Sequence, residues 1–85
     1  MAKIEVYSSG HCPYCVMAKK LLDSKGVDYT EIRVDLDPSK REVMMKRSRQ
    51  RTVPQIFINN DAIGGYTDLL ALNQSKQLDS LLAQS

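Results

Sequence analysis

The hydrophobic period changes twice within the first 34 residues, and these changes constrain the fold more than any other feature. Residues 3–8 alternate apolar and polar side chains, which predicts a strand that ends in the turn Ser8-Ser9-Gly10. From Pro13, apolar side chains recur at helical spacing up to Gly26, which predicts an amphipathic helix ending at a glycine. Residues 29–34 return to an extended pattern. Strand, helix and strand within about 32 residues predict a right-handed βαβ unit with parallel strands.

The middle of the chain adds a second helix and a hairpin. Asp37-Pro38 predicts the N-cap and first turn of a helix that ends near Ser48. Two short apolar runs, Gln55–Ile58 and Ala62–Ile63, predict the strands of a β-hairpin, joined by Asn59-Asn60-Asp61.

The C-terminal region is predicted to be helical and divided in two. Gly64-Gly65 interrupts the chain, and Thr67 is placed to cap a third helix. Apolar side chains then recur at Leu69, Leu70, Leu72, Leu78, Leu81 and Leu82. The predicted fold is α/β with the order βαβαββα.

Length and charge narrow the possible functions. A chain of 85 residues predicts one domain, residues 1–85, with a single small core. Its apolar runs are shorter than a membrane span, and Met1-Ala2-Lys3-Ile4-Glu5 lacks the features of a signal peptide, so we expect a soluble, cytoplasmic protein with no membrane partner. A net charge of +2 does not indicate nucleic-acid binding.

The charge is nevertheless uneven along the chain. Between Lys40 and Arg51 there are six basic residues and one acid, Glu42. We interpret five of these basic residues as a solvated helix face, with attraction of acidic partners as the alternative: Lys40, Arg41, Lys46, Arg47 and Arg49.

The two cysteines, in Cys12-Pro13-Tyr14-Cys15, are better suited to redox chemistry than to stabilisation. A disulfide across so short a loop constrains the unfolded chain very little. If a helix begins at Pro13, Cys12 lies at its N-cap, where backbone N–H groups favour a thiolate. Cys12 is therefore predicted to attack a disulfide sulfur, and Cys15 to resolve the mixed disulfide. An inert buried pair and a zinc site remain alternatives, although His11 is badly placed as a further ligand and no metal is expected.

Three motifs together resemble the glutaredoxin family over essentially the whole chain. Cys12-Pro13-Tyr14-Cys15 is similar to the active site of dithiol glutaredoxins, Thr52-Val53-Pro54 to their cis-proline loop, and Gly64-Gly65-Tyr66-Thr67-Asp68 to their glycine motif. Thioredoxins differ from this chain because they usually carry Gly-Pro between the cysteines and a tryptophan before them. The resemblance implies a thioredoxin-like fold, with a four-stranded mixed sheet flanked by helices, and glutathione as cosubstrate.

The resemblance also assigns glutathione contacts to individual residues. Thr52 and Val53 would hold the cysteinyl backbone, with Pro54 in the cis form. Thr67 and Asp68 would receive the γ-glutamyl group at a helix N-terminus. The other implied contacts are a glycine-carboxylate site at Gln50 and Arg51, a shield over the disulfide at Tyr14, and the glycine motif at Gly65 and Tyr66.

Two positions depart from the family pattern. Members usually carry a lysine three residues before the first cysteine, and this chain has Ser9. His11 replaces a more usual threonine, and we interpret it first as an exposed loop residue. The alternative is that its imidazolium form places positive charge beside Cys12.

The implied function is a glutathione-dependent thiol–disulfide oxidoreductase that removes glutathione from protein thiols and reduces protein disulfides. A redoxin that takes electrons from thioredoxin reductase is one alternative. An iron–sulfur carrier is another, although carriers of this family typically have Cys-Gly-Phe-Ser. The expected partners are glutathione and glutathionylated or disulfide-containing proteins, with ribonucleotide reductase as a candidate, and the expected state is a monomer.

Overall fold

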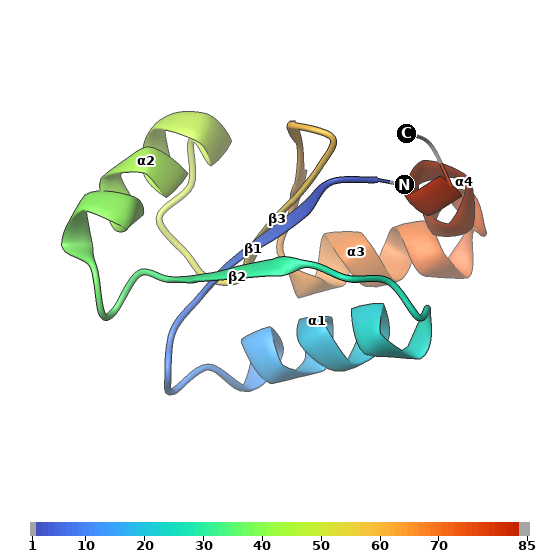
Figure 1. The fold of residues 1–85 in the computed structure, drawn as a ribbon, viewed down its shortest axis with the longest axis horizontal. Helices are drawn as coiled ribbons and strands as arrows, with labels where there is room; N and C mark the ends of the chain where they lie inside the picture. Colours follow the sequence, from blue (N-terminus) through green and yellow to red (C-terminus); the bar gives the residue numbers. More distant parts are fainter. Residues whose placement is uncertain (1, 84–85) are drawn as a thin grey trace.

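The computed structural model describes residues 2–83 and arranges them around one mixed sheet (Figure 1). The strands are β1 (Ile4–Ser8), β2 (Thr30–Arg33), β3 (Gln55–Ile58) and β4 (Asp61–Gly64). The helices are α1 (Pro13–Ser24), α2 (Pro38–Ser48), α3 (Tyr66–Gln74) and α4 (Gln77–Ala83). The strand order is β2-β1-β3-β4, with β1 and β2 parallel and the other pairs antiparallel. The predicted thioredoxin-like class and the divided C-terminal region are confirmed.

Both faces of the sheet are covered, because side chains alternate across its two central strands. Ile4 and Val6 of β1 join residues of β3, α1, α3 and α4 in one buried cluster. Tyr7 of β1 and Phe57 of β3 point the other way and pack with Met44 of α2. The helices therefore form two layers, with α2 on one side and α1, α3 and α4 on the other (Figure 1). Burial on both faces explains why β3 is an unbroken apolar run after Gln55.

The predicted helix ends of α1 and α2 are confirmed. Cys12 is the N-cap of α1 with Pro13 in the first turn, and Gly26 follows the helix with a φ of 68°. Asp37 caps α2 by accepting the Ser39 N–H at 3.1 Å. These ends place Cys12 where β1 runs into α1.

Two boundaries differ from the sequence-based expectation. The hairpin turn is Asn59-Asn60, with φ values of 52° and 71°, and β4 begins at Asp61. Positive φ at both central residues suits a two-residue hairpin, and asparagine tolerates it better than most side chains. The prediction that Thr67 caps α3 is wrong. The N-cap is Gly65, because Asp68 reaches back to its backbone.

Candidate functional site

The two cysteines lie at the N-terminus of α1 and form a disulfide. Their Cα atoms are 5.1 Å apart, and the Cys15 N–H lies 3.1 Å from Cys12 Sγ, which accepts it. Cys15 is fully buried, whereas Cys12 is partly exposed. The more exposed of the two cysteines is thus also the one at the helix N-cap, as the sequence predicted. At that position a thiolate would meet unpaired backbone N–H groups and the positive end of the helix dipole.

The segment after α2 approaches Cys12 from the opposite side. Cys12 Sγ lies 3.6 Å from the Val53 carbonyl oxygen. The Val53–Pro54 peptide bond is cis, which confirms the form that the family resemblance implied for Pro54. The buried amide of Gln55 donates from Nε2 to the Thr52 carbonyl oxygen at 3.0 Å and supports this segment.

A pocket of about 280 Å³ lies between the N-termini of α1 and α3. Its lining comprises all the predicted glutathione-contact residues except Arg51, namely Tyr14, Gln50, Thr52, Val53, Pro54, Gly65, Tyr66, Thr67 and Asp68. Arg51 lies outside this lining with its side chain exposed, and its carbonyl oxygen accepts a hydrogen bond from Arg41 Nη2 at 3.0 Å. Three segments far apart in the sequence therefore meet at one pocket.

Two tyrosines stand together in the pocket lining. The rings of Tyr14, beside the cysteines, and Tyr66, at the start of α3, are stacked with centroids 6.0 Å apart and planes 16° apart. Tyr14 is 57% exposed, so this wall faces solvent and is accessible to a ligand. Both residues were predicted as glutathione contacts, but their contact with each other could not be predicted because they are far apart along the chain.

The glycine motif shapes the start of α3. Gly64 has a φ of 113°, a conformation that favours glycine, and a Cβ at this position would collide with the Asp68 carboxylate. Asp68 Oδ2 accepts the Gly65 N–H at 3.0 Å. Asp68 therefore caps the helix while its carboxylate stays exposed at the pocket.

A larger open groove of about 560 Å³ lies elsewhere, against β4, α3 and α4. It is lined by residues such as Ala62, Ala71 and Leu81, and of the smaller pocket's lining it shares only Asp68. We take the smaller pocket as the candidate site because Tyr14 and Val53 connect it to the cysteines.

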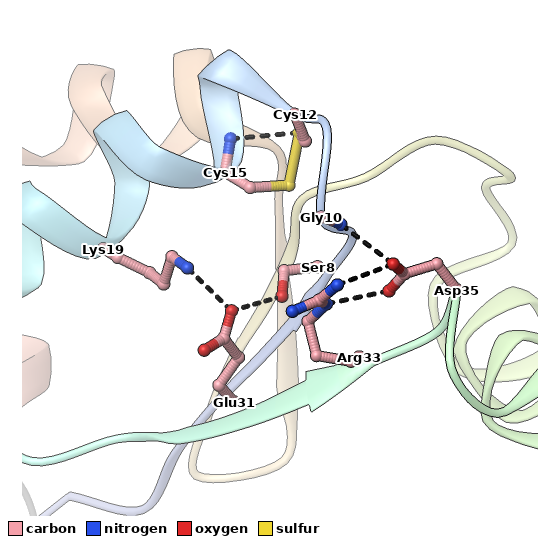
Figure 2. A network of polar contacts seen from close by, with 8 residues as sticks. All are labelled: Ser8, Gly10, Cys12, Cys15, Lys19, Glu31, Arg33 and Asp35. Atoms are coloured by element: carbon pink, nitrogen blue, oxygen red, sulfur yellow. Dashed lines mark hydrogen bonds and ion pairs between the residues drawn. A yellow bond between two sulfur atoms is a disulfide. The ribbon is translucent and has the colours of Figure 1, made fainter.

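Two polar clusters lie near the carboxyl ends of β1 and β2, below the cysteines in the view of Figure 2. In the first, Glu31 Oε2 accepts the Ser8 hydroxyl at 2.6 Å and pairs with Lys19 Nζ of α1 at 2.7 Å. These two hydrogen bonds hold the pKa of Glu31 below its ordinary value. The cluster ties α1 to the sheet.

The second cluster joins Arg33, Asp35 and the loop before Cys12. Arg33 donates to both carboxylate oxygens of Asp35, and Gly10 N–H donates to one of them. The Arg33 hydrogen bonds and the Gly10 N–H hold the pKa of the Asp35 carboxyl well below its ordinary value. This cluster was not predicted, although an acid at the end of a strand expected to lie parallel to residues 3–8 was a usable signal.

The basic run is only partly a solvated face. Arg47 of α2 is half-buried, donates to both carboxylate oxygens of Glu5 at 3.1 and 3.2 Å, and lies with its guanidinium carbon 4.0 Å from the Phe57 ring centroid. The expectation of a solvated side chain is wrong for Arg47, because an acid on β1 draws it inward. The other four members of this set, Lys40, Arg41, Lys46 and Arg49, are exposed as expected.

Residues 2–83 contain no group of three or more histidine, cysteine or acidic side chains arranged to hold a metal ion. Within the same residues, no helix is both long and apolar enough to cross a membrane.

Comparisons with known proteins agree with this geometry. The Glutaredoxin family model matches residues 4–63. Glutaredoxin 3 of Escherichia coli strain K12 is 52% identical over 82 residues, covering 96% of this chain and 99% of the relative. The solution structure of a dithiolic glutaredoxin from Trypanosoma brucei brucei has a TM-score of 0.87 and 42% identity, over 95% of this chain and 87% of that one.

A buckwheat glutaredoxin–glutathione complex has a TM-score of 0.88 and 30% identity, over 95% of this chain and 76% of that one. The family match covers more than half of the chain, and the relatives align over nearly all of it. The chain with the Cys12–Cys15 disulfide beside this pocket belongs to the glutaredoxin family.

Proposed function

We propose that this glutaredoxin removes glutathione from protein thiols and reduces protein disulfides, with Cys12 as nucleophile, Cys15 as resolving thiol and glutathione as electron donor. One observation carries the proposal. Cys12 is partly exposed at a helix N-cap beside a pocket, while Cys15 is fully buried one turn further into the helix. This difference in exposure supports separate roles for the two sulfurs.

Deglutathionylation needs only Cys12. Its thiolate attacks the glutathione sulfur of a mixed disulfide, so that a Cys12–glutathione disulfide forms and the substrate leaves as a thiolate that takes up a proton. A second glutathione thiolate then attacks the glutathione sulfur bound to Cys12. Cys12 leaves as a thiolate, and the product is glutathione disulfide.

Reduction of a protein disulfide needs both cysteines. Attack by Cys12 breaks the substrate disulfide and forms a protein mixed disulfide. The Cys15 thiolate then attacks the Cys12 sulfur, which releases the reduced substrate and forms the Cys12–Cys15 disulfide. Two glutathiones restore the dithiol and leave as glutathione disulfide.

The pocket lining supports a specific orientation of glutathione. The Val53 main chain, which reaches Cys12, would pair with the cysteinyl residue, with Thr52 beside it. The N-terminus of α3 would receive the γ-glutamyl carboxylate at the N–H groups of Thr67 and Asp68, and the Asp68 carboxylate would meet the ammonium group. Gln50 and Arg51 would approach the glycine carboxylate.

The remaining lining residues would shape the pocket. Tyr14 and Tyr66 would form its aromatic wall. Pro54 would hold Val53 in place, and at Gly65 an added Cβ would come within 3.5 Å of the Pro54 carbonyl oxygen, so a side chain there would narrow the pocket.

A coupled assay tests the proposal. The reduced protein is mixed with glutathione, glutathione reductase and a small glutathione mixed disulfide, and NADPH consumption is followed. We expect turnover that depends on glutathione. Turnover only when thioredoxin reductase replaces glutathione and its reductase would instead support the thioredoxin-reductase-dependent alternative.

We further propose that residues 1–85 form a single glutaredoxin domain that acts as a monomer in the cytoplasm, where glutathione keeps thiols reduced. Its protein substrates would be glutathionylated or disulfide-containing proteins, with ribonucleotide reductase as one candidate.

A further inference from the structure

One acidic side chain holds the loop that joins β1 to Cys12. Asp35 follows β2, and its Oδ2 accepts the Gly10 N–H at 3.1 Å. Because β1 and β2 are parallel, their carboxyl ends lie at the same edge of the sheet, where Val34 N–H donates to the Ser8 carbonyl oxygen at 2.9 Å. Backbone pairing thus brings Asp35 to the loop (Figure 2).

Arg33 fixes the Asp35 carboxylate in this position. Its Nε and Nη2 donate to the two oxygens of Asp35 at 2.8 and 2.7 Å, the paired geometry that guanidinium and carboxylate prefer. A Cβ added to Gly10 would lie 2.6 Å from Arg33 Nη2 and 3.2 Å from Asp35 Oδ2. The ion pair therefore packs directly against the loop, and Gly10 permits this approach.

We propose that Asp35 is a positioning residue for Cys12 and that Arg33 is its partner. Gly10 lies two residues before Cys12, so their Cα atoms are within about 7 Å of each other. Fixing Gly10 limits where the Cys12 sulfur sits relative to Val53 and the pocket. Arg33 also balances the Asp35 charge, so that the loop is anchored without net negative charge near a thiolate.

A purely structural role for the pair predicts a different behaviour. Exposed ion pairs contribute little to stability, so such a role predicts small changes in Tm and no change at Cys12. The proposal predicts changes in Cys12 chemistry at nearly constant Tm. It rests on the proposed function for the role of Cys12 as nucleophile.

The first experiment tests the charge balance by titrating the Cys12 thiolate through its ultraviolet absorbance, in a Cys15→Ser background with one thiol. Arg33→Gln leaves Asp35 uncompensated and should raise the Cys12 pKa, whereas Asp35→Asn should lower it, each by about 0.2–0.5 unit. The double variant should return close to the parent, and salt should shrink both single shifts. If the two single variants shifted the Cys12 pKa in the same direction, or not at all, the proposal that Arg33 balances the Asp35 charge would be overturned.

A matched control comes from the other end of α1. Asp79 of α4 pairs at 2.9 Å with Lys25, the C-cap of α1, at the opposite end of that helix from Cys12. Asp79→Asn therefore makes the same change in net charge as Asp35→Asn, but away from the loop. We expect no shift of the Cys12 pKa in this control. A shift equal to that of Asp35→Asn would mean that net charge, and not the pair beside Gly10, sets the pKa.

The second experiment tests the tether, by which we mean the hydrogen bond from the Gly10 N–H to Asp35. Asp35→Asn and Asp35→Ala lose the same charge, but only asparagine can accept the Gly10 N–H. At a pH above the Cys12 pKa, we expect Asp35→Ala to react with a small glutathione mixed disulfide about three- to tenfold more slowly than Asp35→Asn. Equal rates would overturn the tether. If the parent itself did not turn over glutathione mixed disulfides, the proposed function would be wrong, and the same comparison with cystamine would decide the inference.

Discussion

The N-termini of α1 and α3 border the same pocket but are capped in opposite ways. At α1 the capping atom is the Cys12 sulfur, which is also the proposed reacting atom. At α3 the N-cap is Gly65, which has no side chain, and Asp68 reaches back to its N–H from within the first turn. One helix end thus presents the proposed nucleophile, and the other presents backbone N–H groups and a carboxylate.

This difference shows how the same physical feature can serve chemistry at one end and recognition at another. The first N–H groups of any helix lack partners within the helix and attract negative charge. At α1 that attraction favours a thiolate belonging to the protein. At α3 the N-cap is a glycine, and its N–H is accepted by Asp68 from inside the helix, so no side chain occupies the N-cap position. That arrangement suits a carboxylate from a ligand.

The largest expected effect comes from replacing the capping sulfur of α1 by an oxygen in Cys12→Ser. Serine is a good N-cap residue, so Cys12→Ser should keep α1 and the fold intact. It should nevertheless lose both deglutathionylation and protein-disulfide reduction, by about a thousandfold or more, because the nucleophile is gone. Circular dichroism checks the helix, and the two assays check the activities. Substantial deglutathionylation by this variant would contradict the role of Cys12.

The second test separates the two sulfurs of α1. Cys15 is fully buried one turn into the helix, so Cys15→Ser should keep deglutathionylation within a few-fold of the parent. Reduction of a protein disulfide should fall about tenfold or more, because an intramolecular resolving thiol is lost. The ratio of the two activities is the measurement. Equal losses in both would mean that Cys15 supports the site in some way other than resolution.

The fold could be predicted in outline because its signals are local. Pro13 and Gly26 mark the two ends of α1, and the alternation in β1 separates residues for the two faces of the sheet. The cap of α3 was missed because the local pattern favours a threonine side chain as the cap. In the structure Asp68 provides the hydrogen bond from three residues downstream of Gly65.

The site could be predicted only where residue type alone carries the information. The cysteines and the three motifs were found from the sequence, but their contacts with one another were not. Arg47 pairs with Glu5, 42 positions away, and Asp35 reaches Gly10 across 25 positions. The Arg47–Glu5 contact depends on where α2 packs against the sheet, and the Asp35–Gly10 contact depends on the register in which the two predicted parallel strands pair. The sequence pattern specifies neither.

The third prediction concerns the α3 end. Asp68→Ala should raise the KM for a glutathionylated substrate by about tenfold, because a charge-assisted contact with the ligand ammonium is lost. Asp68→Asn keeps an oxygen that can accept the Gly65 N–H, so it should restore the helix cap and the Tm but not the KM. Asp28→Ala, an exposed loop substitution, is the charge-matched control for Asp68→Ala. An unchanged KM in both Asp68 variants would refute the ligand contact.

The fourth prediction concerns how α1 is held to the sheet. The folded pKa of Glu31 lies below its ordinary value of 4.5, so its bonds to Lys19 and Ser8 stabilise the protein above that pH and are lost as the pH falls through the folded pKa. Glu31→Gln should lower the Tm by about 2–6 °C at pH 7 and by much less near pH 3. Thermal unfolding at the two pH values checks it. The same difference in Tm at both would contradict a charge-dependent anchor.

The smallest expected effect comes from adding a cation beside the α1 cap. Ser9 precedes Gly10 in the loop before Cys12, and both oxygens of the Asp35 carboxylate already accept hydrogen bonds from Arg33. The ammonium group of Ser9→Lys should therefore remain free to act on Cys12 and lower its pKa by about 0.3–0.5 unit. The α3 end should be unaffected, so the KM for a glutathionylated substrate should change little.

Salt and position distinguish this effect from a change in structure. The pKa shift should shrink as ionic strength rises, because the added charge is exposed to screening. Ser80→Lys, on the exposed side of α4, adds the same charge far from the loop and should leave the thiolate titration unchanged. A shift that persists at high salt would mean that the lysine displaces the loop from Asp35. In that case the Cys12 pKa would depend more on the position of the loop than on charge. The difference between Asp35→Asn and Asp35→Ala would then be larger than the effect of the charge change that both variants share.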